Sequence, residues 1–331
     1  MADEKSKKYW VGFDLGGTKM MAAVFDADFK LLGQERKKTK SHEGMEAGME
    51  RIAETIREAL KASNVEVRDL LGIGVGSPGP LDLDKGVILD TPNLGWRNTP
   101  LKKTLENGFG CPAVIANDVD AGVYGEYRFG AARKARCVLG VFPGTGIGGG
   151  CVYEGKIFRG KTSSVLEIGH TQVLPNGPLC GCGRRGCLEA VASRLAIAAA
   201  AAAAAFRGEA PYLLANAGMD LANIRSAALA ASVQNGDRAV EKIVRDAAYW
   251  LGIAIANAVN LLGPDVVVLG GGLVEAFPTL LKEEIEKTAR KRVMPAFESA
   301  FEVVVAKLAD NATAMGAAAW AAEEISARKG P

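Results

Sequence analysis

The chain has 331 residues, of which 48% are hydrophobic and 24% charged, with a formal net charge of +2; it is long enough for two domains with separate cores and has the composition of a soluble globular protein. So small a charge gives no electrostatic basis for binding nucleic acid or an anionic membrane. The charged N-terminal residues lack an apolar signal core, and the longest apolar run, residues 195–206, is too short to cross a bilayer, so we expect a cytoplasmic protein.

The first third of the chain predicts strands, one long helix and a glycine turn. Residues 9–14 are expected to form a buried strand that ends at the turn DLGGTK, and strands at 20–25 and 31–39 would complete an antiparallel meander. Apolar residues at helical spacing predict a helix over 43–62. Two short apolar strands follow and lead into GSPGP and into Asn117-Asp118, at residues 71–75 and 113–116.

The strand-turn-strand pattern then occurs a second time. Residues 137–142 and 151–153 are predicted strands on either side of the glycine-rich turn PGTGIGGG, which is therefore equivalent to DLGGTK. We interpret this as an internal structural duplication. The remaining predicted elements are helices over 188–206, 237–262 and about 313–327, and strands over 265–269 and 301–306.

The most specific pattern in the chain is one histidine followed by three cysteines. His170, Cys180, Cys182 and Cys187 have the spacing His-x9-Cys-x-Cys-x4-Cys, with glycines between the cysteines that permit tight turns. One imidazole and three thiolates form a closed tetrahedral set for a structural Zn²⁺. The alternatives are a disulfide framework, which would leave one cysteine over, and unrelated buried thiols.

Three glycine turns that follow predicted strands could hold phosphate groups. Glycine lets backbone N–H groups converge on phosphate oxygens, and Thr18 and Thr145 add hydroxyl donors. The chain has neither a Walker loop nor a dinucleotide-binding fingerprint, and each turn alone could be a simple hairpin. Their equivalent positions favour a nucleotide-binding role. The turns are Gly16-Gly17-Thr18, Gly144-Thr145-Gly146 and Gly270-Gly271-Gly272.

Two aspartates follow predicted strands of the first half. Asp14 could approach a phosphate-bound Mg²⁺, or it could cap its own turn. Asp118 could accept a proton from a substrate hydroxyl during phosphoryl transfer, because a carboxylate at the end of a buried strand faces the cleft of an α/β sheet. Its alternative role is the N-cap of a helix over residues 119–127.

Several further polar residues suit the hydroxyl groups of a sugar. Glu167, His170 and Glu189 provide hydrogen-bond acceptors and a donor, and His170 could bind zinc through one ring nitrogen while offering the other to the sugar. Asn93 in TPNLGW and Gly79 in GSPGP could line the opposite wall. Turn formation is the alternative for both, and we favour it for Gly79.

Together these motifs resemble the ROK family of sugar kinases and repressors. The matching segments occur in order over nearly the whole chain: FDLGGTK, GVGSPGPLD, NLGW, IANDVDAGVYGEY, GTGIGGG, EIGH with CGCGRRGCLEA, and VVLGGGL. The resemblance implies an α/β, actin-like and hexokinase-like ATPase fold, with two α/β domains around a cleft and a duplicated ribonuclease H-like core. We expect the smaller domain to comprise residues 1–117 plus about 313–331, and the larger domain, with the zinc motif, residues 118–312.

The resemblance also implies a role for each matching residue, and MgATP as the donor of a phosphoryl group to a sugar hydroxyl. Asp118 would be the catalytic base. The sugar ligands would be Asn117, Asp118, Glu167, His170 and Glu189, together with Gly79 and Asn93. The phosphate loops would contain Asp14, Gly16, Gly17, Thr18, Lys19, Gly144, Thr145 and Gly146, with Gly271 and Gly272 on the adenosine side. The zinc ligands would be His170, Cys180, Cys182 and Cys187.

We therefore expect an ATP-dependent hexokinase, in the first place a glucokinase that makes glucose 6-phosphate with ATP, Mg²⁺ and a structural Zn²⁺. The alternatives are a kinase of N-acetylmannosamine, N-acetylglucosamine, fructose or allose, and a non-catalytic sugar-sensing regulator. Leu166 departs from the family, which usually has glycine before the Glu of EIGH, and it could reshape the sugar pocket. The resemblance suggests a homodimer. Because the kinase strand begins by residue 9, we expect no DNA-binding segment.

Overall fold

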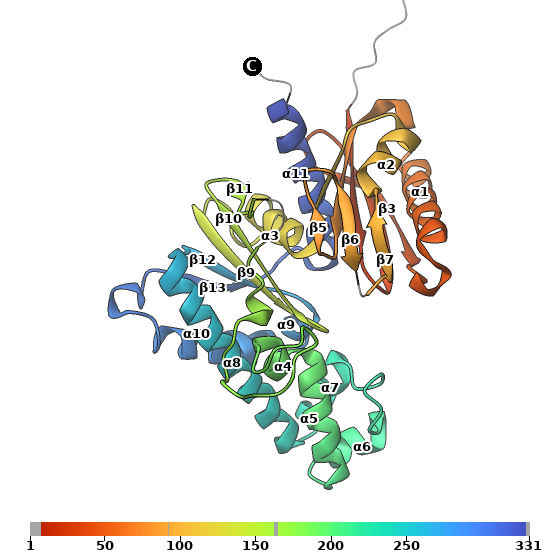
Figure 1. Cartoon of the computed structure of the whole chain (residues 1–331). Helices are drawn as coiled ribbons and strands as arrows, with labels where there is room; N and C mark the ends of the chain where they lie inside the picture. The colour runs from red at the N-terminus through yellow and green to blue at the C-terminus, as the bar shows by residue number, and fades with distance from the viewer. Residues whose placement is uncertain (1–7, 92, 162–164, 329–331) are drawn as a thin grey trace, which may run out of the picture. The chain divides into compact units, whose positions relative to one another are not determined.

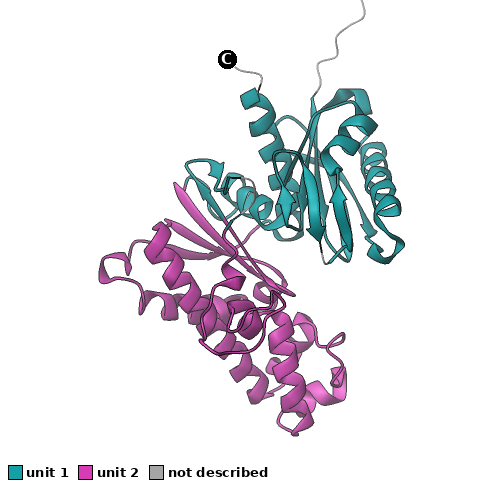
Figure 2. Ribbon diagram, viewed as in Figure 1, with its two compact units in different colours: residues 1–134, 151–165, 308–331 teal, residues 135–150, 166–307 magenta. Residues whose placement is uncertain are grey.

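The computed structural model describes residues 8–91, 93–161 and 165–328 and divides into two compact units (Figures 1 and 2). The first unit consists of Met1–Lys134, Cys151–Val165 and Leu308–Pro331. The second consists of Ala135–Gly150 and Leu166–Lys307. Each unit is described separately below.

The first unit is built on a five-stranded sheet with the strand order β3-β2-β1-β4-β8. Strands β1 to β3 form the expected antiparallel meander, and β4 and β8 run parallel to β1 and β4 respectively. The strands are β1 (Tyr9–Leu15), β2 (Lys19–Phe25), β3 (Leu31–Lys38), β4 (Leu70–Ser77) and β8 (Ala113–Asn117). A smaller sheet contains β5 (Leu81–Asp82), β6 (Val87–Thr91) and β7 (Trp96–Thr99).

Helices cover both faces of this sheet. Val11 and Phe13 of β1 belong to the core that α1 (Met45–Ala62) and α2 (Leu101–Phe109) complete on one face. On the other face α11 (Ala312–Arg328) lies so close that a Cβ on Gly12 would be 1.9 Å from the carbonyl oxygen of Ala314. Asp14 alternates in register with Phe13, so it lies on the α11 side. Short 3-10 turns occur at Ser41–Glu43, Val67–Asp69 and Ala309–Asn311.

The second five-stranded sheet has the order β11-β10-β9-β12-β13, which repeats the connectivity of the first. As in the first sheet, the second and third strands in chain order are antiparallel, and the later strands run parallel to the first. The strands are β9 (Cys137–Pro143), β10 (Ile147–Tyr153), β11 (Lys156–Ile157), β12 (Val266–Leu269) and β13 (Glu302–Val305). The predicted duplication is therefore confirmed. The end of β10 and all of β11 belong to the first unit.

Helices pack on the second sheet around one apolar core. Residues of α8 such as Leu251 and Ile255 share this core with Val267 of β12 and with Leu281 and Ile285 of α10. The helices are α4 (Leu188–Ala192), α5 (Arg194–Phe206), α6 (Pro211–Ala217), α7 (Ser226–Gln234), α8 (Arg238–Leu262), α9 (Gly272–Ala276) and α10 (Pro278–Arg290). Two 3-10 turns are Ile168–His170 and Pro295–Phe297.

The helix expected over residues 188–206 is in fact two helices, so that prediction was wrong. Ser193 has an extended backbone, and its hydroxyl accepts a hydrogen bond from the N–H of Ala196 at 3.2 Å, which makes it the N-cap of α5. By length and composition alone, Leu188–Phe206 could cross a membrane. Its buried residues, among them Ile197 and Ala201, instead belong to the core of the second unit.

Two other boundaries also differ from expectation. The helix after β8, α3 (Asp118–Arg128), groups with the first unit because it packs on α11, where Tyr124 meets Trp320 edge-on at 5.1 Å between ring centroids. The division after residue 117 is therefore replaced by one after Lys134. Strand β10 begins at Ile147, inside the expected glycine turn, because its glycines admit close neighbours: a Cβ on Gly149 would be 2.4 Å from the Leu166 carbonyl oxygen.

Candidate active site and metal centre

The histidine and three cysteines of the second unit form one compact cluster. The four ligand atoms of His170, Cys180, Cys182 and Cys187 lie within 4.8 Å of one another. Cys182 Sγ is 3.7 Å from Cys187 Sγ, and Cys180 Sγ is 3.6 Å from His170 Nδ1. A tetrahedral zinc ion with ordinary bond lengths requires about 3.8 Å between two sulfurs and about 3.6 Å between sulfur and nitrogen. The donor set therefore fits a single zinc ion.

The chain around this cluster is folded tightly by glycine. Gly186 has φ of 73°, and a Cβ there would be 1.7 Å from the Leu174 carbonyl oxygen. Cys180 and Cys187 are buried, whereas Cys182 and His170 are exposed. The three cysteines are free thiols rather than disulfide partners. His170 directs Nδ1 to the sulfurs, so its Nε2 is the ring nitrogen that remains for another ligand.

Glu189 connects this cluster to the glycine turn at residues 144–146. It lies in the first turn of α4, which begins directly after Cys187. Its Oε2 accepts a hydrogen bond from the N–H of Ile147 at 2.9 Å, and its Oε1 lies 3.9 Å from Cys180 Sγ. A Cβ on Gly146 would be 2.4 Å from Oε2. Glycine at 146 is therefore what allows this carboxylate to reach the turn.

The turn itself is held by α5 as well. The N–H of Gly144 donates to the carbonyl oxygen of Gly146 at 2.8 Å, which closes the turn. The N–H of Arg194 donates to the Gly144 carbonyl oxygen at 2.9 Å, and its guanidinium donates to Thr145 Oγ1 at 2.8 Å. Within the same unit the turn that follows β12 lies alongside, because a Cβ on Gly271 would be 2.9 Å from the Pro143 carbonyl oxygen. Gly272 begins α9.

In the first unit, Asn117 and Asp118 occupy the junction of β8 and α3. Asn117 is the N-cap: its Oδ1 accepts hydrogen bonds from the N–H groups of Val119 at 2.9 Å and Asp120 at 3.2 Å. The alternative that Asp118 caps this helix is therefore wrong. Asp118 is the first helical residue, and its Oδ1 accepts from Val119 N–H at 3.0 Å. The junction places a carboxylate at the end of a parallel strand, as expected.

Asp14 lies in a cluster of carboxylates and cations. The pKa of Asp14 is raised from its ordinary 3.8 to about 7, chiefly by burial and also by the neighbouring Asp118 and Asp310, against the opposing effects of Lys19 and Arg36. Lys19 Nζ and Arg36 Nη1 lie 3.2 and 2.7 Å from Asp310 Oδ2. Asp14, Asp118 and Asp310 provide carboxylate oxygens, the type of ligand that Mg²⁺ prefers, and Lys19 and Arg36 offset part of their negative charge. Lys19, expected to contact phosphate, thus forms an ion pair.

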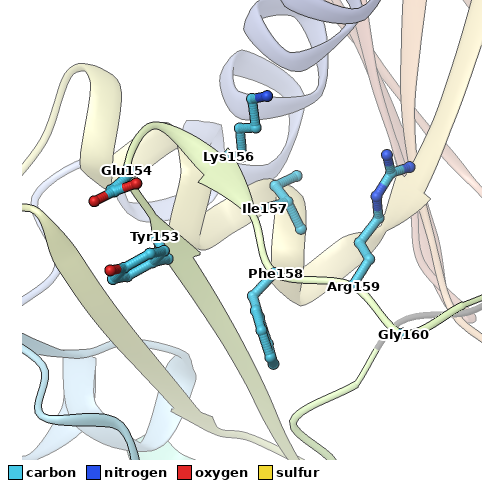
Figure 3. Close-up of a pocket in the computed structure, with 7 residues that line it drawn as sticks. All are labelled: Tyr153, Glu154, Lys156, Ile157, Phe158, Arg159 and Gly160. Carbon is cyan, nitrogen blue, oxygen red and sulfur yellow. The ribbon is translucent and has the colours of Figure 1, made fainter.

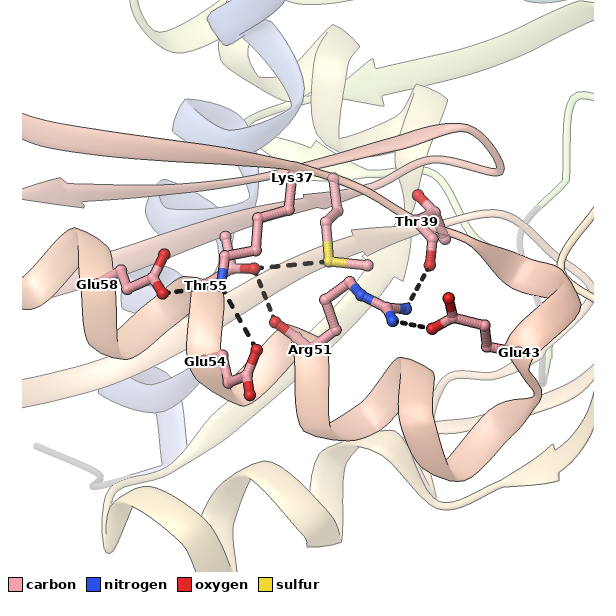
Figure 4. A network of polar contacts seen from close by, with 8 residues as sticks. Lys37, Thr39, Glu43, Arg51, Glu54, Thr55 and Glu58 are labelled. Carbon is pink, nitrogen blue, oxygen red and sulfur yellow. Dashed lines mark hydrogen bonds and ion pairs between the residues drawn. The ribbon is translucent and has the colours of Figure 1, made fainter.

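The first glycine turn is supported from α1 through Thr39. Thr39 donates its hydroxyl to the Gly16 carbonyl oxygen at 2.6 Å and its N–H to the Thr18 carbonyl oxygen at 2.9 Å. Figure 4 shows Arg51 of α1 donating to the carbonyl oxygen of Thr39, at 2.8 Å, and also binding Glu43. This network fixes the backbone of the turn and leaves Thr18 exposed.

Asn93 and Gly79 lie beside these residues of the first unit. A Cβ on Gly17 would be 3.2 Å from Asn93 Cβ, so Asn93 is next to the first glycine turn. A Cβ on Gly79 would be 3.8 Å from Asn117 Nδ2. Asn117 uses its oxygen as the helix cap, so its amide nitrogen is the group that faces Gly79. The first unit therefore assembles most of the residues predicted for it.

A separate pocket of about 480 Å³ lies on the β10–β11 hairpin (Figure 3). Arg159 turns toward α11, where its guanidinium lies over Trp320 at 5.3 Å and 3.5 Å from Glu324. None of the predicted sugar, nucleotide or metal residues lines this pocket, and we assign it no ligand. Its lining residues are Tyr153, Glu154, Lys156, Ile157, Phe158, Arg159 and Gly160.

Comparison with known proteins decides the family. A sequence model described as the ROK family matches residues 10–324. The chain belongs to the ROK family. It is 35% identical to a glucokinase of Thermotoga maritima over 95% of this chain and 98% of that protein. It is 27% identical to a xylose repressor of Caldicellulosiruptor bescii, over 95% of this chain and 78% of the repressor. The structure of a ROK family glucokinase from Streptomyces griseus, in complex with glucose and AMPPNP, is 31% identical with a TM-score of 0.82 and covers 95% and 99% of the two chains.

This ROK chain has Leu166 at a position where the backbone conformation favours glycine. Leu166 has φ of 64°, a left-handed conformation that glycine adopts without cost and that a leucine rarely adopts. The family's usual glycine suits this backbone. Leu166 packs partly buried against the core of the second unit, while the adjacent Glu167 is exposed. The side chain of Leu166 thus constrains the segment that presents Glu167 and His170.

Three residues with structural roles at these sites were not predicted from sequence. Asp310 pairs with Lys19, and Arg194 binds the turn at Thr145. Glu126 is fully buried and accepts hydrogen bonds from the N–H groups of Ala131 and Leu308, both at 2.7 Å. A single carboxylate within the segment GVYGEY of α3 was the sequence signal for Glu126. The other two had none, because their partners are distant in sequence.

Proposed function

We propose that this protein is an ATP-dependent hexokinase that phosphorylates glucose on its 6-hydroxyl. The relationship to glucokinases over nearly the full length of both chains supports the reaction class. The observation that carries the proposal is the β8–α3 junction, where Asn117 caps the helix and Asp118 stands at its first position. The helix does not need the Asp118 side chain as its cap, so that carboxylate is suited to receive the proton of a sugar hydroxyl.

The cluster around Asp14 is proposed as the magnesium side of the nucleotide site. The residues fit a cation, because an acid whose pKa is raised by burial and by two neighbouring carboxylates gains most from a positive charge. Mg²⁺ would neutralise phosphate charge when bound with ATP. The glycine turns at 16–18 and 144–146 would donate backbone N–H groups to phosphate oxygens, and Gly271 and Gly272 would face the adenosine.

The zinc ion is proposed to be structural. His170, Cys180, Cys182 and Cys187 would take all four tetrahedral positions of the ion, which leaves none for a reacting water. Bound through Nδ1, His170 would offer Nε2–H to a sugar hydroxyl. The cluster also fixes the start of α4, and with it Glu189. The other residues proposed to bind the sugar are Glu167 in the second unit and Gly79, Asn93 and Asn117 in the first.

Glucose is proposed over other sugars, and catalysis over regulation. The chain is 35% identical to the Thermotoga maritima glucokinase and 27% identical to the Caldicellulosiruptor bescii xylose repressor. N-acetylmannosamine, N-acetylglucosamine, fructose and allose are the competing substrates, and Leu166 is the residue most able to change the choice. A homodimer in the cytoplasm, where ATP is available and thiols stay reduced, belongs to the same proposal.

A sugar panel tests this function directly. Purified protein with ATP and Mg²⁺ should release ADP most efficiently with glucose, and the product should carry phosphate on O6. A higher kcat/KM for N-acetylmannosamine or fructose would replace glucose but keep the reaction. Sugar binding by calorimetry without ADP release from any sugar would instead support the regulator.

A further inference from the structure

Arg194 holds the glycine turn at residues 144–146 with both its backbone and its side chain. Its N–H donates to the Gly144 carbonyl oxygen at 2.9 Å, and one guanidinium nitrogen donates to Thr145 Oγ1 at 2.8 Å. The two residues of the side-chain contact are 49 positions apart. Ser193 caps α5 immediately before Arg194, so the arginine is fixed at the first position of the helix.

The charge of Arg194 is not balanced where it lies. The first turn of α5 contains no acidic residue, and among the described residues Arg194 forms no ion pair. The nearby carboxylate of Glu189 is bonded to Ile147 N–H instead. At the other end of the same helix, Arg207 is paired with Glu209 at 2.7 Å. A cation at a helix N-terminus is electrostatically unfavourable, so an arginine held there is poised for an anion.

We propose that Arg194 binds the phosphates of ATP at this turn and neutralises charge on the phosphoryl group during transfer. This inference rests on the proposed kinase function. A guanidinium has five N–H donors in a fixed fork; the contact with Thr145 uses one side of that fork and leaves others for phosphate oxygens. Charge-assisted bonds of this kind are the strong ones.

The step that Arg194 assists is balanced as follows. The sugar oxygen forms a bond to the γ-phosphorus while the bond from that phosphorus to the bridging oxygen breaks. The electron pair of the broken bond stays on ADP, and the hydroxyl proton passes to Asp118. Arg194 transfers no proton; its positive charge stabilises oxygens whose negative charge rises as the bond breaks.

If Arg194 only held the turn in place, its substitution would weaken the binding of ADP and adenosine equally. Two substitutions separate this structural role from phosphate binding. Arg194→Gln removes the charge and retains an amide N–H donor on a shorter side chain. Arg194→Lys keeps the charge but loses the fork. Arg207→Gln is the matched control, because it changes an arginine of the same helix that is paired on the surface away from the turn.

The experiment measures kcat and KM for ATP with saturating glucose, and the affinities for ADP and for adenosine by calorimetry. Arg194→Gln should lower kcat/KM for ATP by about 10- to 100-fold, as expected for a charged hydrogen bond. It should weaken ADP binding and leave adenosine binding unchanged, with partial recovery in Arg194→Lys. Arg207→Gln should match the wild type.

Two results would overturn the inference. One is a kcat/KM for ATP in Arg194→Gln within about threefold of the wild type, well short of a charged hydrogen bond. The other is an equal loss of ADP and adenosine affinity, which indicates a misfolded turn rather than a lost phosphate contact. If the wild type releases no ADP with any sugar, the kinase proposal fails by itself. The difference between ADP and adenosine titrations then still decides whether Arg194 binds phosphate.

Discussion

Glu189 accepts a hydrogen bond from the backbone N–H of Ile147 at 2.9 Å, and it stands two residues after Cys187, a proposed metal ligand. The last residue of the cluster and the end of the glycine turn are therefore joined through one side chain. Any shift of the cluster would move the carboxylate, and with it the turn. In this way the proposed zinc ion would act on both proposed substrate sites of the second unit.

Two substitutions of Glu189 should separate these effects. Glu189→Gln keeps a carbonyl oxygen for Ile147 N–H but loses the charge toward a sugar hydroxyl. It should raise KM for glucose by about 10-fold or more and leave KM for ATP unchanged. Glu189→Ala removes both contacts and should raise both constants. Steady-state kinetics with each substrate varied measures both constants. If Glu189→Gln raised KM for ATP and KM for glucose by the same factor, this division of roles would be refuted.

Loss of the metal should act through substrate binding. Cys182 is exposed, so Cys182→Ser opens no cavity in the core and changes little but the ligand. The variant should lose its zinc, melt at lower temperature and bind glucose more weakly. Metal analysis, thermal melting and glucose titration measure this. Arg184→Ser, an exposed neighbour in the same loop, is the control and should behave as wild type. Fully active protein purified without zinc would contradict the structural role.

The raised pKa of Asp14 predicts how stability depends on pH. Its folded value is about 7 against an ordinary 3.8, so the neutral acid is favoured in the fold. The stability from this group is complete below about pH 4 and is lost as pH rises through 7. Asp14→Asn has no charge to bury, so its stability should not fall in this way. Without Mg²⁺ and nucleotide, the stability of the variant relative to the wild type should increase between pH 5 and pH 8, by on the order of a few kcal/mol or several degrees in Tm.

Melting curves of both proteins across this pH range test the Asp14 prediction. Adding Mg²⁺ with ADP should narrow the difference at pH 8, because a cation beside Asp14 stabilises its charged form. A Tm difference that stays constant with pH would show that Asp14 titrates normally.

Gly130 should be indispensable for the bonds of Glu126. A Cβ at residue 130 would be 1.9 Å from Glu126 Oε2, the oxygen that accepts from Ala131 N–H. Gly130→Ala should destabilise the protein by about 1–3 kcal/mol. Gly108→Ala is the matched control, because that position is inside α2 with no atom within 4 Å of an added Cβ. It should stabilise by about 0.5–1 kcal/mol. Denaturant unfolding of both variants measures these changes in the free energy of unfolding. Equal changes in Gly130→Ala and Gly108→Ala would contradict the role given to Gly130.

Features that depend on residues close together in the sequence could be predicted from it. The spacing of His170 and the cysteines predicted a cluster that the structure forms, and alternating strands and turns predicted the duplicated sheets. What could not be predicted depends on distant partners. The packing of α3 on α11 moved the unit boundary, and the contact of Arg194 with Thr145 joins residues far apart in the chain.

Competition between neighbouring residues was the other source of error. Asn117 and Asp118 are both good helix caps, and only the backbone geometry shows that Asn117 takes this position. Ser193 lies inside the segment predicted as one helix, but it ends α4 and caps α5. In each case several residues were chemically suitable, and the tertiary structure selected one.

The most direct test of the account is the turnover number of Asp118→Asn with ATP and glucose. Asparagine keeps the shape of the side chain, and the cap of α3 stays on Asn117, so melting temperature and glucose affinity should remain close to wild type. The substituted amide cannot accept the hydroxyl proton. The account predicts a fall in kcat of about 10²- to 10⁴-fold. A fall of less than about tenfold, with unchanged melting, would lie below the effect of a general base and would contradict the role of Asp118.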